Sequence, residues 1–330
     1  MSYDPNVLQR AAEQLEQRRR ARRTQIEQRR QKVYASQPRL AQIDRELRAT
    51  MTGVFTAALR TGADPGPALA QLRSDNLDLQ LERRAILGAM GMGPEDLDDS
   101  PLCAECGDTG WKGATMCSCL QELYTKEQVR TLSDVLDLGS HTFDNFRLDY
   151  YSAMPDPQTG ASPRQTMELV YEVCLNYAHK FGSFYFKNLF LSGAPGLGKT
   201  FLSACIARTV SEQGRSVVYT SAGDAFARFE EQKFARDPGA RDETRRYLGC
   251  DLLILDDLGC ELTTQFVQSA LYTIVNTRLT AGLHTVISSN LSMDDIAQRY
   301  SPQTASRLSG EYHVLHFEGQ DIRQLKKNAF

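Results

Sequence analysis

Residues 193–200 read Gly-Ala-Pro-Gly-Leu-Gly-Lys-Thr. They fit the pattern G-x-x-x-x-G-K-[ST], in which glycines let the backbone wrap around phosphates and the next helix directs its N–H groups at them. An apolar run over residues 184–191 precedes this stretch and a helix-like run over residues 201–210 follows it. This strand–loop–helix setting argues against the alternative, a glycine-rich turn beside a surface lysine. We therefore expect a nucleoside triphosphate here, with Lys199 at the β- and γ-phosphates and Thr200 as a ligand of Mg²⁺.

Length and composition limit the other functions of the chain. Its 330 residues are enough for two domains or for one domain with appendages, and 41% of them are hydrophobic, which is adequate for a packed core. The formal net charge of −3 gives no overall argument for nucleic-acid binding. No apolar stretch approaches the roughly 20 residues of a membrane helix, and the polar N-terminus does not resemble a signal peptide. We expect a cytoplasmic protein without membrane contact.

Five strand-like runs, separated by helix-like ones, occupy the last 190 or so residues of the chain. They cover residues 185–191, 216–220, 251–255, 284–289 and 312–317. This alternation predicts an α/β domain over residues 140–330, with a mainly parallel sheet and helices on both faces.

Polar side chains follow two of these strand-like runs. Asp256 and Asp257 close the apolar sequence LLILDD at residues 252–257, and one strand-like run separates this sequence from the phosphate loop. We expect Asp256 to hold Mg²⁺ and Asp257 to orient or deprotonate the attacking water. Asn290 follows the next run and is expected to contact the γ-phosphate or that water; a plain turn asparagine is the alternative.

Four of the eight cysteines form a cluster, in the order Cys103-x₂-Cys106 and Cys117-x-Cys119. Four thiolates on two short turns can complete a tetrahedral zinc site, although the second pair has one intervening residue instead of the usual two. Four ordinary cysteines are the alternative. We favour a structural zinc module over residues 99–125, in which the metal largely holds the segment folded.

Residues 1–98 are rich in helix-forming Arg, Gln, Glu, Leu and Ala, and predict long helices folded as a hairpin or small bundle. Breaks are expected at Pro38 and at a turn over residues 62–67. Seven arginines lie between residues 18 and 30. They form a surface that binds phosphates or an acidic partner, or else they are simply the solvated face of a helix. A connecting helix is expected over residues 121–138 and should end at Gly139. Its part after the zinc module, residues 126–139, is the expected linker to the α/β domain.

Taken together, these motifs make residues 140–330 similar to the AAA+ ATPases of the DnaC/DnaI helicase-loader group, and the transposon protein IstB shares much of the pattern. The resemblance rests on the phosphate loop and on LILDDLGCEL (253–262), SSN (288–290), SRL (306–308) and EGQDIR (318–323). TFDNF (142–146) resembles a TFxNF segment that lies near the nucleotide base in that group.

The resemblance implies a role for each matching position. Residues 252–257 become the Walker B strand, Asn290 becomes sensor 1 and Arg323 becomes sensor 2. Arg307 becomes an arginine finger that acts on ATP in a neighbouring subunit; for both arginines the alternative is an ordinary surface residue. The nucleotide-binding positions, which include the Walker A loop, are Gly193, Ala194, Pro195, Gly196, Leu197, Gly198, Lys199, Thr200 and Phe201.

The resemblance also implies that residues 222–248 are a helical insertion that contacts single-stranded DNA. Basic side chains can bind the DNA backbone, and aromatic side chains can stack on its bases. Charge kept merely for solubility is the alternative. The basic residues are Arg228, Lys233, Arg236, Arg241, Arg245 and Arg246, and the aromatic ones are Phe226, Phe229, Phe234 and Tyr247.

Two departures from the family pattern affect the expected activity. Many AAA+ enzymes have Glu where this chain has Asp257, so we expect slow hydrolysis that DNA or a partner stimulates. Only residues 324–330 follow Arg323, so no C-terminal lid domain is expected, and self-assembly should be weak until a helicase or DNA templates it.

The sequence therefore predicts an ATPase that uses ATP, Mg²⁺ and Zn²⁺ and loads a hexameric DnaB-type replicative helicase onto single-stranded DNA. Residues 1–98 would bind the helicase, and the loader would assemble as a homo-oligomeric ring or spiral. One alternative is an IstB-like transposition helper. Another is a nucleotide-dependent adaptor without significant hydrolysis.

Overall fold

The structure is a computed structural model that describes residues 3–60, 66–133, 136, 141–155, 157, 160–234 and 244–328. The chain divides into two compact units: residues 13–117 form one, and residues 1–12 together with 118–330 form the other. Most of the turn predicted over residues 62–67 lies outside the described residues, as does Gly139. Among the described residues, no helix is both long and apolar enough to span a membrane.

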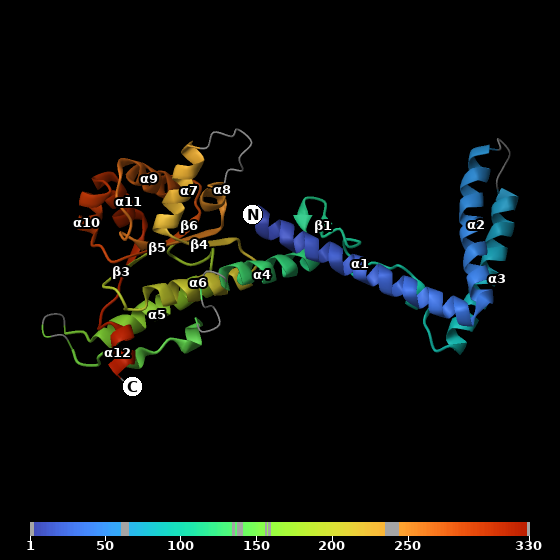
Figure 1. The fold of residues 1–330 in the computed structure, drawn as a ribbon, viewed down its shortest axis with the longest axis horizontal. Coiled ribbons are helices and arrows are strands. Elements are labelled where there is room, and N and C mark those ends of the chain that lie inside the picture. Colours follow the sequence, from blue (N-terminus) through green and yellow to red (C-terminus); the bar gives the residue numbers. More distant parts are fainter. Residues whose placement is uncertain are drawn as a thin grey trace. The chain divides into compact units, whose positions relative to one another are not determined.

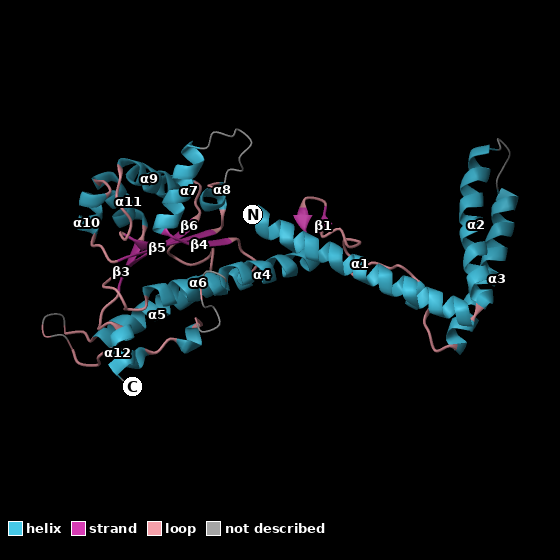
Figure 2. Cartoon of the chain, in the orientation of Figure 1, coloured by secondary structure: helices cyan, strands magenta, loops and turns pink. Residues whose placement is uncertain are grey.

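The first unit is built from long helices, as predicted for the N-terminal region (Figure 2). They are α1 (Pro5–Ser36), α2 (Pro38–Arg60) and α3 (Gly66–Ala89), followed by the 3₁₀ turn η1 (Pro94–Leu97). Pro38 begins α2, because a proline lacks the N–H group that a continuous helix would need there. A small apolar core and ion pairs such as Arg83–Asp44 at 2.8 Å hold these helices together.

The second unit contains a parallel sheet that is five-stranded within the described residues, in the order β4-β5-β6-β3-β7. Its strands are β3 (Asn188–Ser192), β4 (Val217–Ser221), β5 (Leu252–Leu258), β6 (His284–Ser289) and β7 (His313–His316). All five predicted strands are thereby confirmed. The first begins at Asn188 and not at residue 185, because its neighbours begin at His284 and His313 and offer no earlier backbone for pairing.

Helices cover both faces of this sheet, as predicted (Figure 1). One face packs against α4 (Ser118–Ser133), α5 (Pro163–His179) and α6 (Lys199–Glu212), and its core includes Leu189, Leu191 and Ile254. Side chains of the opposite face, such as Phe190, Leu253 and Ile287, pack against five other helices of the unit. Those helices are α7 (Ala222–Phe234), α8 (Arg245–Gly249), α9 (Gln265–Thr280), α10 (Met293–Arg299) and α11 (Pro302–Glu311).

The ends of the second unit lie against its core elements. Among the described residues after β7, the one helix is α12 (Ile322–Asn328), which leaves no lid domain in this part of the chain. At the other end, the Tyr3 and Tyr124 rings pack edge to face, and Arg10 donates to Glu127 at 3.3 Å and to Thr131 at 2.7 Å on α4. No motif in the sequence indicates this contact between residues 3–12 and α4.

Arg278 on α9 is fully buried and joins three elements through neutral acceptors. Its guanidinium donates to the carbonyl of Tyr247 in α8 at 2.7 Å and to that of Cys250, which directly follows α8, at 3.1 Å. It also donates to the His284 carbonyl at 2.6 Å and to the Thr285 hydroxyl at 3.0 Å, at the start of β6. Arg278 therefore connects α8 and α9 to the first residues of β6.

We expect Arg278→Met to lower the free energy of unfolding by about 3 kcal/mol or more, because several buried acceptors lose their donor at once. Urea unfolding followed by circular dichroism measures this loss. Arg208→Met is the matched control, since Arg208 lies on the surface of α6 beside Glu212 and should change stability by about 0.5 kcal/mol or less. Equal unfolding midpoints for the two variants would contradict the assigned role.

Candidate nucleotide-binding site

The phosphate loop lies between the end of β3 at Ser192 and the start of α6 at Lys199, which confirms the predicted strand–loop–helix setting. Gly193, Gly196 and Gly198 all have positive φ, at 154°, 79° and 94°. A Cβ atom on Gly196 would lie 2.0 Å from Oδ1 of Asp321, and one on Gly193 would lie 2.6 Å from the Phe317 carbonyl. The path of the loop therefore requires glycine, both for its backbone conformation and for its close neighbours.

Protein donors hold the carbonyl groups of this loop. The Ile322 N–H donates to the Gly196 carbonyl at 3.0 Å, and the buried Tyr151 hydroxyl donates to the Leu197 carbonyl at 2.8 Å. Because the C=O and N–H of one planar peptide point in opposite directions, these bonds turn the following N–H groups away from Tyr151 and α12. Such successive, oriented N–H groups are what an anion-binding loop needs.

Lys199 Nζ points back into the loop, where it donates to the carbonyls of Gly193 at 2.6 Å and Ala194 at 2.8 Å. The residue is 6% exposed, and this burial lowers the pKa of its ammonium group, an effect that the charges of Asp257 and Asp256 oppose. A phosphate in the loop would offer charged acceptors, which form stronger bonds to an ammonium than neutral carbonyls do.

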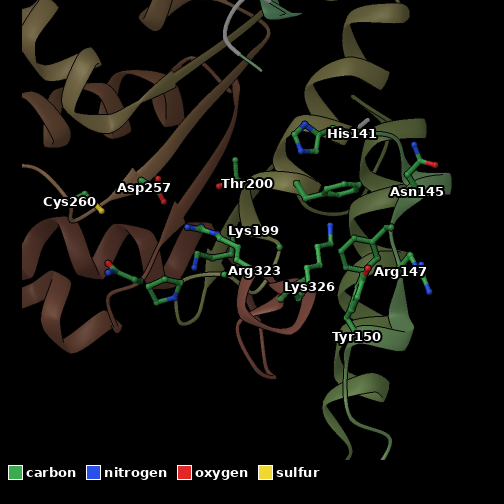
Figure 3. Close-up of a pocket in the computed structure, with 17 residues that line it drawn as sticks. His141, Asn145, Arg147, Tyr150, Lys199, Thr200, Asp257, Cys260, Arg323 and Lys326 are labelled. Atoms are coloured by element: carbon green, nitrogen blue, oxygen red, sulfur yellow. The ribbon is translucent and has the colours of Figure 1, made fainter. Parts of the chain in front are cut away.

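A cavity of about 600 Å³ opens beside the loop, within the range typical of small-molecule sites. Figure 3 shows Lys199, Thr200, Asp257 and Arg323 toward one side of it and Tyr150 with other residues of the segment before α5 toward the other. The first side is charged and adjoins the phosphate loop. The size of the cavity and the charge on this side fit a nucleotide whose phosphates lie at Lys199.

Aromatic rings form the other side of the cavity. His141 and Phe201, whose rings meet edge to face at 4.7 Å, line this side together with Asn145 and Phe146, and the ring of Phe146 stacks on that of Tyr171 at 5.5 Å. Flat apolar walls with a few polar groups suit a nucleobase. Of these residues, only those of TFDNF were expected near a base. His141, Tyr150 and Lys326 also line the cavity and carry no motif that would have identified them.

The two acids at the end of β5 occupy different environments. Asp256 is buried, and Tyr219 and Ser288 both donate hydrogen bonds to its carboxylate. Asp257 lines the cavity, and its pKa is raised by burial and then by the charge of Asp256, while Lys199 and Arg323 lower it. Asp257 thus faces the space where a nucleotide would lie, whereas neighbouring hydroxyls orient Asp256 behind it.

The structure brings two of the remaining predicted residues to this site and leaves one outside it. Asn290, just after β6, and Arg323, on α12, line the nucleotide cavity. Arg307 on α11 is exposed and lines a separate hollow with Tyr272 and Gln303. A finger that acts on a neighbouring subunit would lie on such an outer face, and its role stays a prediction.

The four clustered cysteines come together in space, with all their sulfur atoms within 4.8 Å of one another. Cys103 Sγ and Cys117 Sγ are 3.7 Å apart, and thiolates at tetrahedral zinc lie about 3.8 Å apart when each Zn–S bond is about 2.3 Å. The hairpin of β1 (Trp111–Lys112) and β2 (Thr115–Met116) separates the two pairs. The Asp108 carboxylate accepts from the N–H groups of Leu102 and Cys103, which shapes the first turn. This arrangement fits four-coordinate zinc.

The insertion over residues 222–248 differs from its prediction in its aromatic surface. Phe226 is buried with Ala222 and Ala225 because that side of α7 packs on the sheet, and Tyr247 on α8 is buried in the same core. Phe234 is 67% exposed, and Lys233 lies 5.1 Å from the centre of the Phe266 ring. Arg236 and Arg241 lie outside the described residues. Among the described aromatic residues of the insertion, Phe234 thus presents the most open ring.

Comparison with known proteins identifies the family of this domain. Residues 177–329 match the profile of the family described as IstB-like ATP binding protein. The chain is 31% identical over 118 residues to "Replicative helicase loader DnaI" of Bacillus subtilis (strain 168), across 35% of this chain and 37% of that protein. It is 32% identical over 101 residues to the uncharacterised protein YdaV of Escherichia coli (strain K12), across 30% and 39%.

The chain thus spans less than two fifths of the length of either relative. Among solved structures, a crystal structure of the DnaC helicase loader covers 55% of this chain and 99% of its own, with 19% identity and a TM-score of 0.45. The family resemblance seen in the motifs is confirmed for the matched region, and residues 177–329 of this chain are an IstB-like ATP-binding domain.

Proposed function

We propose that this protein is an ATPase that loads a hexameric, DnaB-type replicative helicase onto single-stranded DNA. The observation that carries the proposal is the cavity in which the phosphate loop, Asp257, Asn290 and Arg323 converge, on a domain related to a replicative helicase loader. We assign the helicase contact to residues 1–98, zinc to residues 99–125, the link to residues 126–139, and nucleotide binding to residues 140–330.

Each residue of the cavity has a distinct task in this proposal. Lys199 and the backbone N–H groups that the phosphate loop offers bind the phosphates, and Thr200 and Asp256 would hold Mg²⁺, which would supply positive charge to the phosphates. Asp257 orients the attacking water and accepts its proton. Asn290 contacts the γ-phosphate or that water, and Arg323 adds positive charge from α12.

Two features keep hydrolysis slow until partners are present. Asp257 is one methylene shorter than the glutamate at this position in many AAA+ enzymes, so it holds water less closely. Arg307 lies outside the nucleotide cavity of its own chain, and it acts on the nucleotide bound to a neighbouring copy. An arginine finger supplied in trans contributes roughly 10³- to 10⁵-fold to nucleotide hydrolysis, so a monomer is nearly inactive.

ATP acts as a switch between two states of the loader. With ATP bound, copies of the loader assemble in a ring or spiral and engage single-stranded DNA through α7, α8 and exposed groups such as Phe234 and Lys233. Loss of the γ-phosphate changes the contacts of the loop and of α12, which is bonded to Gly196. The assembly then releases DNA and helicase.

The test of this proposal is the mass of complexes formed by the full chain and the replicative helicase of the same organism, with ATP and without it. We expect a helicase-bound assembly that ATP changes in size, and whose capture on single-stranded DNA requires ATP. The absence of any helicase complex, with ATP and DNA present, would contradict the proposal.

An IstB-like transposition helper is the second candidate, because the matching family profile is described as IstB-like ATP binding protein. Its phosphate loop and acids would work in the same way, so the partner decides between the two. Retention of a transposase and not a helicase on the immobilised full chain would favour it. A nucleotide-dependent adaptor would retain a partner but release no phosphate at steady state, with or without single-stranded DNA.

A further inference from the structure

The two acids at the end of β5 sit in a break of the β5–β6 pairing. Leu255 pairs with Ile287, but the next pair is Leu258 with Ser289, so Asp256 and Asp257 together face Ser288 alone. This is a β-bulge, which re-aims side chains and is uncommon between parallel strands. Asp257 accordingly has φ of 56°, a left-handed conformation that few residues other than glycine adopt.

The bulge lets one hydroxyl group contact both acids. Ser288 Oγ accepts a hydrogen bond from the N–H of Asp257 at 2.9 Å, and it donates its own hydrogen to Oδ1 of Asp256. Ser288 is fully buried. The chain of bonds therefore runs from the backbone of Asp257 through Ser288 to the carboxylate of Asp256.

A second hydroxyl fixes the other oxygen of the same carboxylate. Tyr219 on β4 donates to Oδ2 of Asp256 at 2.5 Å, and Tyr219 is 9% exposed. Both carboxylate oxygens thus have a buried donor, one from each neighbouring strand. Each oxygen accepts more than one hydrogen bond, so Asp256 keeps capacity for a metal ion or its water.

We infer that Ser288 and Tyr219 are positioning residues of the hydrolytic site, which set the orientation of Asp256 toward Mg²⁺ and hold the bulge that aims Asp257 into the cavity. This inference rests on the proposed ATPase function. Neither side chain is among the residues that line the described cavity, so both act through the two acids. Loss of such outer partners of a metal site typically reduces metal affinity or activity by about 10- to 100-fold.

The test compares Ser288→Ala and Tyr219→Phe with two matched controls in the full chain. Ser289→Ala removes a neighbouring buried hydroxyl that donates to the Leu258 carbonyl, and Tyr177→Phe removes one that donates to the Lys187 carbonyl. Neither control hydroxyl contacts an acid through these bonds. Thermal unfolding of all four variants identifies any loss that is due to stability alone.

We expect Ser288→Ala and Tyr219→Phe to lower kcat by about 10-fold or more, to raise the Mg²⁺ concentration for half-maximal hydrolysis, and to leave KM for ATP within about threefold. A second measurement does not depend on turnover: calorimetry gives the affinity for ADP in the presence of Mg²⁺ and in the presence of EDTA, which removes the metal. Only the Mg²⁺-dependent part of this affinity should fall in the two variants.

Unchanged kcat and Mg²⁺ requirement in both variants, relative to the controls, would overturn the inference. Because two strands supply the two hydroxyls, Tyr219→Phe decides the question even if Ser288→Ala does not fold. Failure of the wild-type chain to bind nucleotide or release phosphate would instead overturn the proposed function, so the two failures are distinguishable.

Discussion

A Lys199→Ala variant is expected to lose ATP binding and hydrolysis together. Lys199 is the buried cation at the phosphate loop, and its Nζ already lies within hydrogen-bonding distance of two loop carbonyls. Bonds from a charged donor contribute about 1.5–3 kcal/mol each, so losing two phosphate contacts should weaken ATP binding by about 100-fold or more. Fluorescence titration with a labelled ATP and steady-state phosphate release measure the two losses.

Lys187→Ala is the matched control for this experiment. Lys187 is exposed and immediately precedes β3, so it lies at the end of the strand opposite the phosphate loop. It should bind ATP as the wild type does. Lys199→Ala protein that is folded and binds ATP with the affinity of Lys187→Ala would show that the loop is not the nucleotide site.

Removal of zinc is expected to unfold the cysteine module. Its two strands have two residues each, and such a short hairpin is not stable by itself in water. Structural zinc in small modules contributes about 10–16 kcal/mol of apparent binding free energy at neutral pH. Without the metal, the part of residues 99–125 that precedes α4 should become the preferred site of limited proteolysis, and Cys103→Ser should have the same effect.

Metal content and cleavage pattern together test this prediction. We expect one zinc ion per chain in the wild type and in Cys260→Ser, because Cys260 lies outside the cluster and lines the nucleotide cavity. ATP binding should survive zinc removal, since the described residues that line the cavity begin at His141. An unchanged cleavage pattern in zinc-free protein would contradict a structural role for the metal.

The sequence predicted those parts of the structure that depend on residues close together in the chain. The glycines of residues 193–200 and the apolar runs of the sheet follow from backbone conformation and periodicity, and the structure has the loop and strands at nearly the predicted places. The cysteine spacing likewise predicted the cluster, because the turns between such close positions leave few other arrangements.

Features that depend on the pairing of distant segments were not predictable in the same way. Nothing in the spacing of residues places Tyr219 and Ser288 on the two oxygens of Asp256, because the strand order and the bulge at Asp257 determine those contacts. The bond from Tyr151 to the phosphate loop also depends on tertiary structure.

The interpretation of residues 222–248 as an aromatic surface was partly wrong for a related reason. Aromatic composition does not say which side of a helix faces the core, and the structure places Phe226 and Tyr247 against the sheet. Phe234, near the end of α7, remains exposed, so it is the position of this segment at which we expect a base to stack.

The central claim is that the phosphate loop holds Mg²⁺ and ATP, and a crystal structure of the full chain grown with a non-hydrolysable ATP analogue and Mg²⁺ tests it most directly. We predict phosphates along residues 193–200, Lys199 Nζ moved from the carbonyls of Gly193 and Ala194 to the β- and γ-phosphates, and the metal beside Thr200 and Asp256. A loop without nucleotide at saturating concentration, with Lys199 still bonded to those two carbonyls, would contradict it.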